Sequence, residues 1–380
     1  MSFCLIAPTA ATARVADGGG PTEFGVASDH VQFVRYVPFE AGTATGARII
    51  GHYMYTTSWR SLSIYDVSDP TNPQLMSTTP LAKSGDPVSF ENENVATNGS
   101  VLIFSETIPR NILRVYDVED KTNPTEVASV DTTTGAKFQA ANHTIACLFD
   151  CTWLWGSTGA IIDLHDPSHP KVIHHLWNEG LPGQQGHNVV EVKPGFVLTA
   201  TQPMMYLDAR DPIHPKVLAV GGNADKRFIH SARWPNSGSD RFALATGETN
   251  FQPRCGNSNG SFMVWDTKNW QKTHTLTMTD DYRVSNGDEV DGSPPANTQG
   301  CSSHWFQENP TFHDGGLVAS GFYDHGMRFF DVSSAGKISL AGYFLPYAAD
   351  TSASYWVTDR IVYGIDYENG FYILKWTGKL

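Results

Sequence analysis

The chain has 380 residues, with 26 basic and 39 acidic side chains and a formal net charge of −13. This acidic balance, without a basic stripe, argues against a surface that binds nucleic acid. No run of the sequence approaches the roughly 18–20 continuous apolar residues that span a bilayer. We therefore expect neither nucleic acid nor a membrane as a partner.

The first residues combine a short apolar core with small residues but lack the positive start of a signal peptide. We interpret residues 1–21 as a tail or signal-peptide remnant and residues 22–380 as a single domain. The expected location is the cell exterior or the periplasm, with the cytoplasm as the alternative.

A segment made of two apolar residues, Asp and a turn rich in Asp and Pro recurs along the chain. The clear copies are IYDVSDPTNP (64–73), VYDVEDKTNP (115–124), IIDLHDPSHP (161–170) and YLDARDPIHP (206–215). Weaker copies follow as VWDTKNWQK (264–272) and FFDVSSAGK (329–337), and the chain closes with YILKW (372–376). The starts lie 43 to 65 residues apart, a period typical of four-stranded propeller blades. Seven copies predict seven blades.

Each copy lies within a set of short apolar runs that Gly, Pro and Asp separate, and no stretch has the period and length of an amphipathic helix. The sequence therefore predicts an all-β fold, a seven-bladed β-propeller. Its last unit contains only three strands. The run HVQFVRYVPFE at 30–40 is predicted to supply the missing outer strand, which would close the ring and cover both edges.

Four of the five cysteines fall into two pairs. Cys147 and Cys151 flank a hairpin turn of the third blade, where a disulfide fits and a zinc site fits poorly because the spacing is wrong. Cys255 and Cys301 flank the one long insertion, which a disulfide would help to order. Two disulfides would indicate an exported protein.

Four histidines stand at the start of the first strand in successive repeats. Aligning the blades by the turn that ends this strand places His143 and His187 at one position without gaps, and His230 and His304 begin their strands in the same way. Inner strands crowd around the propeller axis, so these four imidazoles are predicted to converge on one metal ion. The alternative is descent of the repeats from a single histidine-bearing ancestor.

Three further residues are candidates for catalysis. Glu91 occupies the aligned position in the second blade. We expect it to accept a hydrogen bond from a metal-ligating imidazole and so to fix the tautomer of that ring, without binding the metal itself. Glu248 is a second nearby acid. His325 lies in a top-face loop of the sixth blade, where ordinary turn chemistry before a glycine is the alternative. Aromatic residues near the same face, such as Trp305 and Tyr323, either line a pocket or pack between blades.

Motifs of nucleophilic and nucleotide chemistry are absent from the sequence. It contains no GxSxG elbow, no GxxxxGK[ST] loop and no GxGxxG between a strand and a helix. Covalent catalysis by Ser or Cys is therefore not expected.

The units IYDVSDPTNP and YLDARDPIHP resemble LVIVD repeats, a bacterial β-propeller repeat, across four clear blades of the seven predicted. The four-histidine layout is similar to that of two propeller groups. Carotenoid-cleaving oxygenases hold iron(II) on the axis with four histidines and outer-shell glutamates, and selenium-binding proteins with methanethiol oxidase activity are associated with copper. Both resemblances imply redox metalloenzymes.

These observations favour a metal-dependent oxidoreductase, with copper or iron held by His143, His187, His230 and His304. The expected partners are a small organic substrate and dioxygen. Zinc in the same site would instead favour hydrolase or lyase chemistry of the lactonase type. The third hypothesis is that the protein is an exported propeller that binds a ligand without catalysing a reaction.

Overall fold

A computed structural model describes most of the chain, and almost all of its regular structure is antiparallel strand. Within the described residues, only three four-residue helical turns interrupt the strands: η1 (Leu176–Glu179), α1 (Pro235–Gly238) and α2 (Trp270–Thr273). No helix in the described part of the chain is long and apolar enough to cross a membrane. The described residues are 19–39, 44–58, 60–81, 92–106, 112–132, 144–157, 159–182, 184–222, 228–248, 260–284, 300–367 and 370–380.

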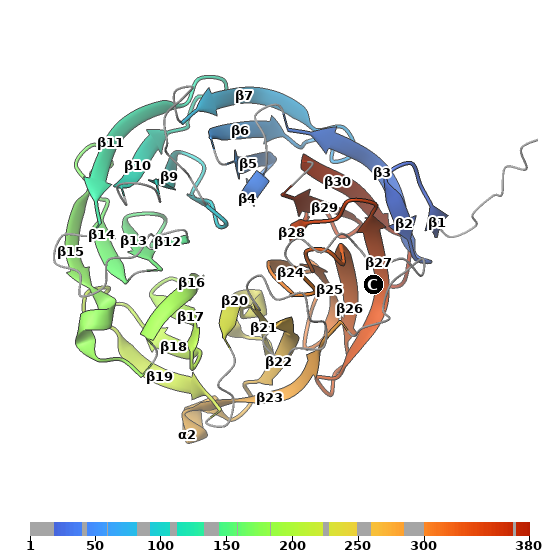
Figure 1. Ribbon diagram of the computed structural model, residues 1–380. Helices are drawn as coiled ribbons and strands as arrows, with labels where there is room; N and C mark the ends of the chain where they lie inside the picture. Colours follow the sequence, from blue (N-terminus) through green and yellow to red (C-terminus); the bar gives the residue numbers. More distant parts are fainter. Residues whose placement is uncertain are drawn as a thin grey trace, which may run out of the picture.

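The strands form seven four-stranded blades around one axis, which confirms the predicted fold (Figure 1). Each of the first six blades starts at the axis and adds its strands outward in chain order. Blade one contains β4 (Ala44–Ile50), β5 (Tyr53–Ser58), β6 (Ser61–Asp66) and β7 (Gln74–Pro80). Blade two contains β8 (Ala96–Thr97), β9 (Val101–Glu106), β10 (Ile112–Asp117) and β11 (Thr125–Asp131). Blade three contains β12 (Ile145–Leu148), β13 (Trp153–Gly156), β14 (Ala160–Asp163) and β15 (Lys171–His175).

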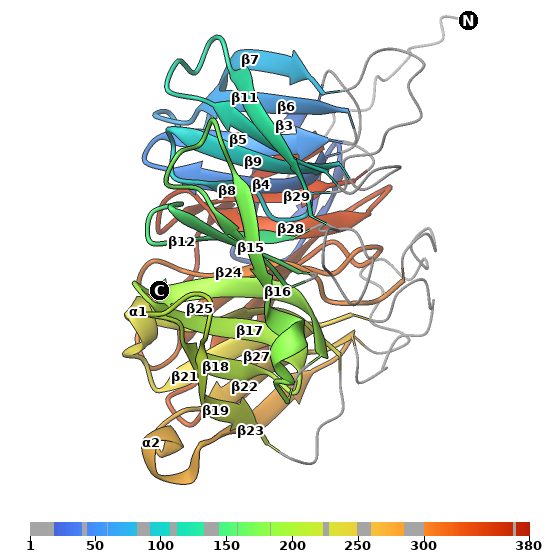
Figure 2. The ribbon, with the colours of Figure 1, turned by 90° about the vertical axis from the view of Figure 1, so that its left-hand side faces the viewer.

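Blades four to six follow the same order, and Figure 2 shows the ring from its side. Their strands are β16 (Gln184–Lys193), β17 (Phe196–Gln202), β18 (Met205–Asp208) and β19 (Lys216–Gly221); β20 (Ile229–Arg233), β21 (Phe242–Gly247), β22 (Phe262–Asp266) and β23 (Thr275–Tyr282); β24 (Phe306–Glu308), β25 (Gly316–Gly321), β26 (Met327–Val332) and β27 (Ile338–Pro346).

The seventh blade joins the two ends of the described chain, as the sequence predicts. Its strands β28 (Thr351–Trp356), β29 (Ile361–Asp366) and β30 (Gly370–Trp376) are completed by β3 (Val31–Pro38), which pairs antiparallel with β30. A short hairpin of β1 (Gly20–Pro21) and β2 (Gly25–Ala27) pairs with β27 and extends the sixth blade. This hairpin begins inside the segment that the sequence analysis assigned to the tail.

The hydrophobic core is divided between the blades. The described residues form seven apolar clusters, one at each interface between neighbouring blades. Strands are therefore buried on both faces, as the strand β5 shows with five consecutive buried residues. Burial on both faces explains why the sequence reads as apolar runs rather than as a clean alternation.

The repeated Asp has a structural role that explains its recurrence. At the end of the third strand, Asp66 accepts a hydrogen bond from the backbone amide of Ser68, and Asp117, Asp163, Asp208 and Asp266 bond in the same way two residues on. A side chain that caps its own turn in this manner is an Asx turn. The repeat therefore encodes the sharp exit from the third strand in blades one to five.

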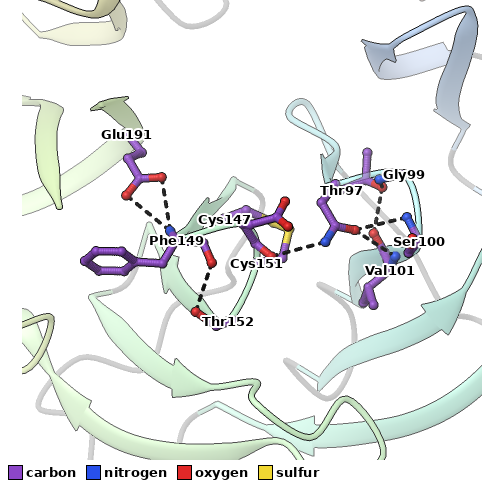
Figure 3. The surroundings of a disulfide bond; sticks show 11 residues. Thr97, Gly99, Ser100, Val101, Cys147, Phe149, Cys151, Thr152 and Glu191 are labelled. Atoms are coloured by element: carbon purple, nitrogen blue, oxygen red, sulfur yellow. Dashed lines mark hydrogen bonds between the residues drawn. A yellow bond between two sulfur atoms is a disulfide. The ribbon is translucent and has the colours of Figure 1, made fainter. Parts of the chain in front are cut away.

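The predicted disulfide between Cys147 and Cys151 is present and closes the hairpin between β12 and β13 (Figure 3). The residues Phe149 to Cys151 all have left-handed backbone angles, which non-glycine residues adopt at a cost. The Glu191 carboxylate accepts the backbone amide of Phe149 and thereby supports this turn. Cys301 is also disulfide-bonded, and its predicted partner Cys255 lies outside the described residues.

The blade interfaces predict where stability resides. Leu374 on β30 is fully buried in the cluster between blades six and seven, whereas its neighbour Lys375 is exposed. We expect Leu374→Ala to lower the free energy of unfolding by about 2–5 kcal/mol, because it leaves a cavity. Lys375→Ala, the matched control on the same strand, should change it by less than about 0.5 kcal/mol. Urea denaturation measures both, and equal losses would contradict this division of the core.

Candidate functional site

Three of the four predicted histidines meet at the axis, where the inner strands begin. His187 lies on β16 and His230 on β20, and His304 stands two residues before β24. The rings of His187 and His230 have centroids 3.7 Å apart, and those of His230 and His304 lie 4.1 Å apart. All three side chains are buried. The fourth histidine, His143, lies outside the described residues.

A buried acid, Glu93, joins the three imidazoles and completes what we call the His–Glu cluster: Glu93, His187, His230 and His304. Its Oε2 lies 3.1 Å from Nε2 of His230 and 3.5 Å from Nε2 of His187, and its Oε1 lies 3.3 Å from Nε2 of His304. Three separate blades therefore direct the same ring nitrogen at one carboxylate.

The opposite ring nitrogens show how two of these histidines are oriented. Nδ1 of His187 bonds the backbone oxygen of His230 at 3.0 Å, and Nδ1 of His304 bonds that of Ser352 at 2.8 Å. A carbonyl oxygen only accepts, so both Nδ1 atoms carry the proton. In the neutral tautomer, Nε2 then presents a lone pair to Glu93. His304 accordingly makes no hydrogen bond of ordinary geometry through Nε2 within the described part of the chain.

Two lone pairs that face a carboxylate repel it unless a positive charge lies between them. Protons can supply that charge. Burial lowers the pKa of His304, but the charge of Glu93 outweighs burial and raises it. Burial likewise raises the pKa of Glu93, and the charges of His304 and His187 with a hydrogen bond from His230 hold it well below its usual range. Burial lowers the pKa of His230. A metal cation would supply the charge equally well.

A second set of polar groups surrounds the cluster. The indole N–H of Trp305 donates to Oε2 of Glu93 at 3.2 Å, and the hydroxyl of Tyr367 donates to Oε1 at 3.4 Å. Glu248, a predicted catalytic acid, has Oε2 3.9 Å from Nε2 of His230 and accepts the Tyr323 hydroxyl at 2.7 Å. Ligand atoms of His230, Glu248 and His304 lie within 4.8 Å of one another, so Glu248 borders the same centre.

The remaining predicted residues are placed differently. Glu91 lies outside the described residues. His325 is buried with its Nε2 3.8 Å from Sγ of Cys301, and it does not share a ligand group with the cluster in the described part of the chain. The tight turn from Phe322 to Gly326 instead brings Tyr323 to the site, with its ring centroid 4.6 Å from that of His304.

Glu93 was not predicted from the sequence, although a signal for it exists. Asn94 bridges Thr144 in parallel between blades two and three. Glu93 and His143 each stand one residue before this bridge, so Glu93 takes the histidine position of its own blade. The strand from this bridge to the hairpin turn has one residue more in blade three, because Thr97 pairs with Leu102 as Leu148 pairs with Trp153. The ungapped alignment, which matched Glu91 with His143, was therefore two residues out of register at the level of the bridge.

Known structures support the fold and not the chemistry. The chain is a β-propeller, and residues 41–79, which include the first blade, match the LVIVD repeat model. The β-propeller domain of Myceliophteria thermophila Cps50 (Swd1) superposes with a TM-score of 0.61 at 13% identity, covering 90% of this chain and 98% of that one.

The WD40 repeats of RRP9 are also similar, with a TM-score of 0.58 at 9% identity over 91% of this chain and 97% of that chain. A chain in a mitotic checkpoint complex gives a TM-score of 0.56 at 14% identity, covering 98% and 97%. No curated protein matches the sequence. At these identities the likeness extends to the fold alone.

The buried charges predict a pH dependence in metal-free protein. Because folding lowers the pKa of Glu93, its ionised carboxylate stabilises the fold at pH values above the ordinary carboxyl pKa. This contribution is lost as the pH falls through the lowered pKa. Because folding raises the pKa of His304, its protonated imidazole stabilises the fold at pH values below the ordinary imidazole pKa. This contribution is lost as the pH rises through the raised pKa. We expect the stability difference between wild type and Glu93→Gln to be largest between about pH 4.5 and 6.5.

Chemical denaturation at several pH values, after dialysis against a chelator, measures this difference. Glu23→Gln, at an exposed position, is the control and should leave the pH profile of the wild type unchanged. A difference between wild type and Glu93→Gln that stays constant from pH 4 to 8 would show that Glu93 and His304 are not charge partners.

Proposed function

We propose that the protein is a metal-dependent oxidoreductase in which the His–Glu cluster binds one copper or iron ion. His187, His230, His304 and Glu93 are the proposed ligands, and His143 is the further ligand expected from the sequence. The observation that carries the proposal is the tautomer of His187 and His304, whose Nδ1 protons are held by backbone oxygens while both Nε2 atoms face a carboxylate.

The spacing of the donor atoms supports a common ion. Donors about 2.1 Å from a tetrahedral metal lie about 3.4 Å apart, and the three nitrogen–oxygen separations are 3.1, 3.3 and 3.5 Å. Backbone hydrogen bonds to Nδ1 are the usual way in which proteins fix the tautomer of a ligating histidine. Imidazole with one carboxylate suits iron and copper, and also zinc.

The roles of the surrounding residues follow from their contacts. Trp305 and Tyr367 donate to Glu93 and hold its carboxylate in place. Glu248, bonded to Tyr323 at the edge of the cluster, is positioned to take or give a proton. Copper or iron at this centre would activate dioxygen toward a small organic substrate. The disulfide between Cys147 and Cys151 favours an oxidising location outside the cytoplasm.

Metal content tests the proposal directly. Protein prepared without a nickel column is expected to hold close to one equivalent of copper or iron by elemental analysis. Adding the metal to chelator-treated protein in weak buffer should also release protons, because the metal replaces those that the cluster carries. Electron paramagnetic resonance then identifies copper or iron. A full equivalent of zinc alone would favour hydrolase or lyase activity over the proposed oxidoreductase activity. Protein that binds none of the added metals would contradict the proposed metal site.

Single variants test the ligands. His187→Ala and Glu93→Gln should each lower metal uptake by at least about tenfold, whereas His169→Ala should leave it unchanged. His169 is the matched control because it is an exposed histidine in an Asp-Pro turn, where its ring bonds Asp166. Unaltered uptake by His187→Ala, in protein whose circular dichroism matches the wild type, would exclude this residue as a ligand.

A further inference from the structure

A cavity of about 380 Å³ follows the His–Glu cluster along the inner strands. Asn188 and Ser231, which come directly after His187 and His230, line it, as do the next residues of β16, β20 and β24. Trp305 belongs to both places, because it lines the cavity and donates to Glu93. The cavity and the cluster are therefore neighbouring parts of one channel.

The cavity contains a cation, Arg48, that has no ion-pair partner among the described residues. Arg48 on β4 lines it, and within the described part of the chain this side chain makes no ion pair and no hydrogen bond. Arg233 on β20 also lines the cavity, but it forms an ion pair with Glu308 at 2.5 Å. The surrounding protein and the nearby charge of Arg233 lower the pKa of Arg48, but its side chain is exposed to the open cavity, and a guanidinium stays protonated at any ordinary pH.

The described acidic groups near the cavity are engaged elsewhere and do not contact Arg48. The carboxylate of Glu191 accepts the backbone amides of Phe149 and Gly195 (Figure 3), and the carboxylate of Glu308 is taken by Arg233. The Tyr355 oxygen accepts the Ala47 amide at 3.5 Å, which leaves its O–H proton for another acceptor.

We propose that this cavity binds the carboxylate of a small organic acid, with Arg48 as its ion-pair partner and Tyr355 as a hydrogen-bond donor. A single arginine without an ion-pair partner among the described residues suits a singly charged ligand, and a guanidinium matches the two oxygens of a carboxylate. Trp305 and Trp356 also line the cavity and offer flat apolar surface to the body of the ligand. The volume falls in the range of pockets that enclose small molecules.

Arg48 is unusual in a chain whose net charge is −13. An acidic protein repels anions in general, so an organic acid needs a local cation to bind. The position of Arg48 inside the channel, rather than on the outer surface, points to a ligand that enters the channel.

Calorimetric titration of the chelator-treated protein with benzoate tests the proposal. We expect one benzoate per chain, and Arg48→Met should weaken binding by roughly 10- to 100-fold, the usual effect of losing a charged hydrogen-bond partner. Arg48→Lys should retain part of the affinity. Benzamide, which has the same shape without the charge, should bind wild type at least about tenfold more weakly than benzoate.

Arg35→Met is the matched control, because Arg35 is an exposed arginine on the outer strand β3. It should leave the affinity for benzoate unchanged. The proposal is overturned if wild type shows no binding of benzoate up to about 10 mM, or if Arg48→Met and benzamide both match wild type with benzoate. Because the protein is free of metal, this outcome is independent of whether the His–Glu cluster binds an ion.

Discussion

The pairing of β3 with β30 is the constraint on which the rest of the molecule depends. It joins residues 31–38 to residues 370–376 and turns a linear series of blades into a ring. Only in a closed ring do the inner strands surround one axis, so that equivalent positions of different blades face each other. Trp305 and Glu93 are 212 residues apart and yet share a hydrogen bond for this reason.

Closure also explains how the fold tolerates a buried carboxylate. An ionised acid removed from water is costly unless it is paired and hydrogen-bonded. Glu93 receives the indole of Trp305, the hydroxyl of Tyr367 and the converging imidazoles, all from other blades. No local segment could provide these partners, so the charge is stable only in the assembled ring. Cations bound there, whether protons or a metal, would in turn favour the closed state.

The repeat predicted the fold well because its most visible residue has a local cause. Asp66 and its equivalents cap their own turns, so the same chemistry recurs where the chain leaves the third strand of blades one to five. The three described histidines were found by a similar argument, because residues at the same position of successive repeats lie at the same depth in the channel. Glu93 was missed because the ungapped alignment placed Glu91, two residues earlier, at the histidine position, and only the pairing of the strands shows how many residues separate that position from the turn.

Residues that break the repeat are harder to predict, and they are the ones that give the channel its chemistry. His325 looked equivalent to a site residue by its loop, but the turn there presents Tyr323 instead. Arg48, Arg233 and Tyr355 come from blades one, five and seven with different neighbours in sequence, so no motif connects them. The outer strands and interfaces are constrained by packing with adjacent blades. The inner strands face the channel with one side, which leaves their residues free to differ between blades, so the channel combines residues at equivalent positions, such as the three histidines, with residues that only one blade carries, such as Arg48.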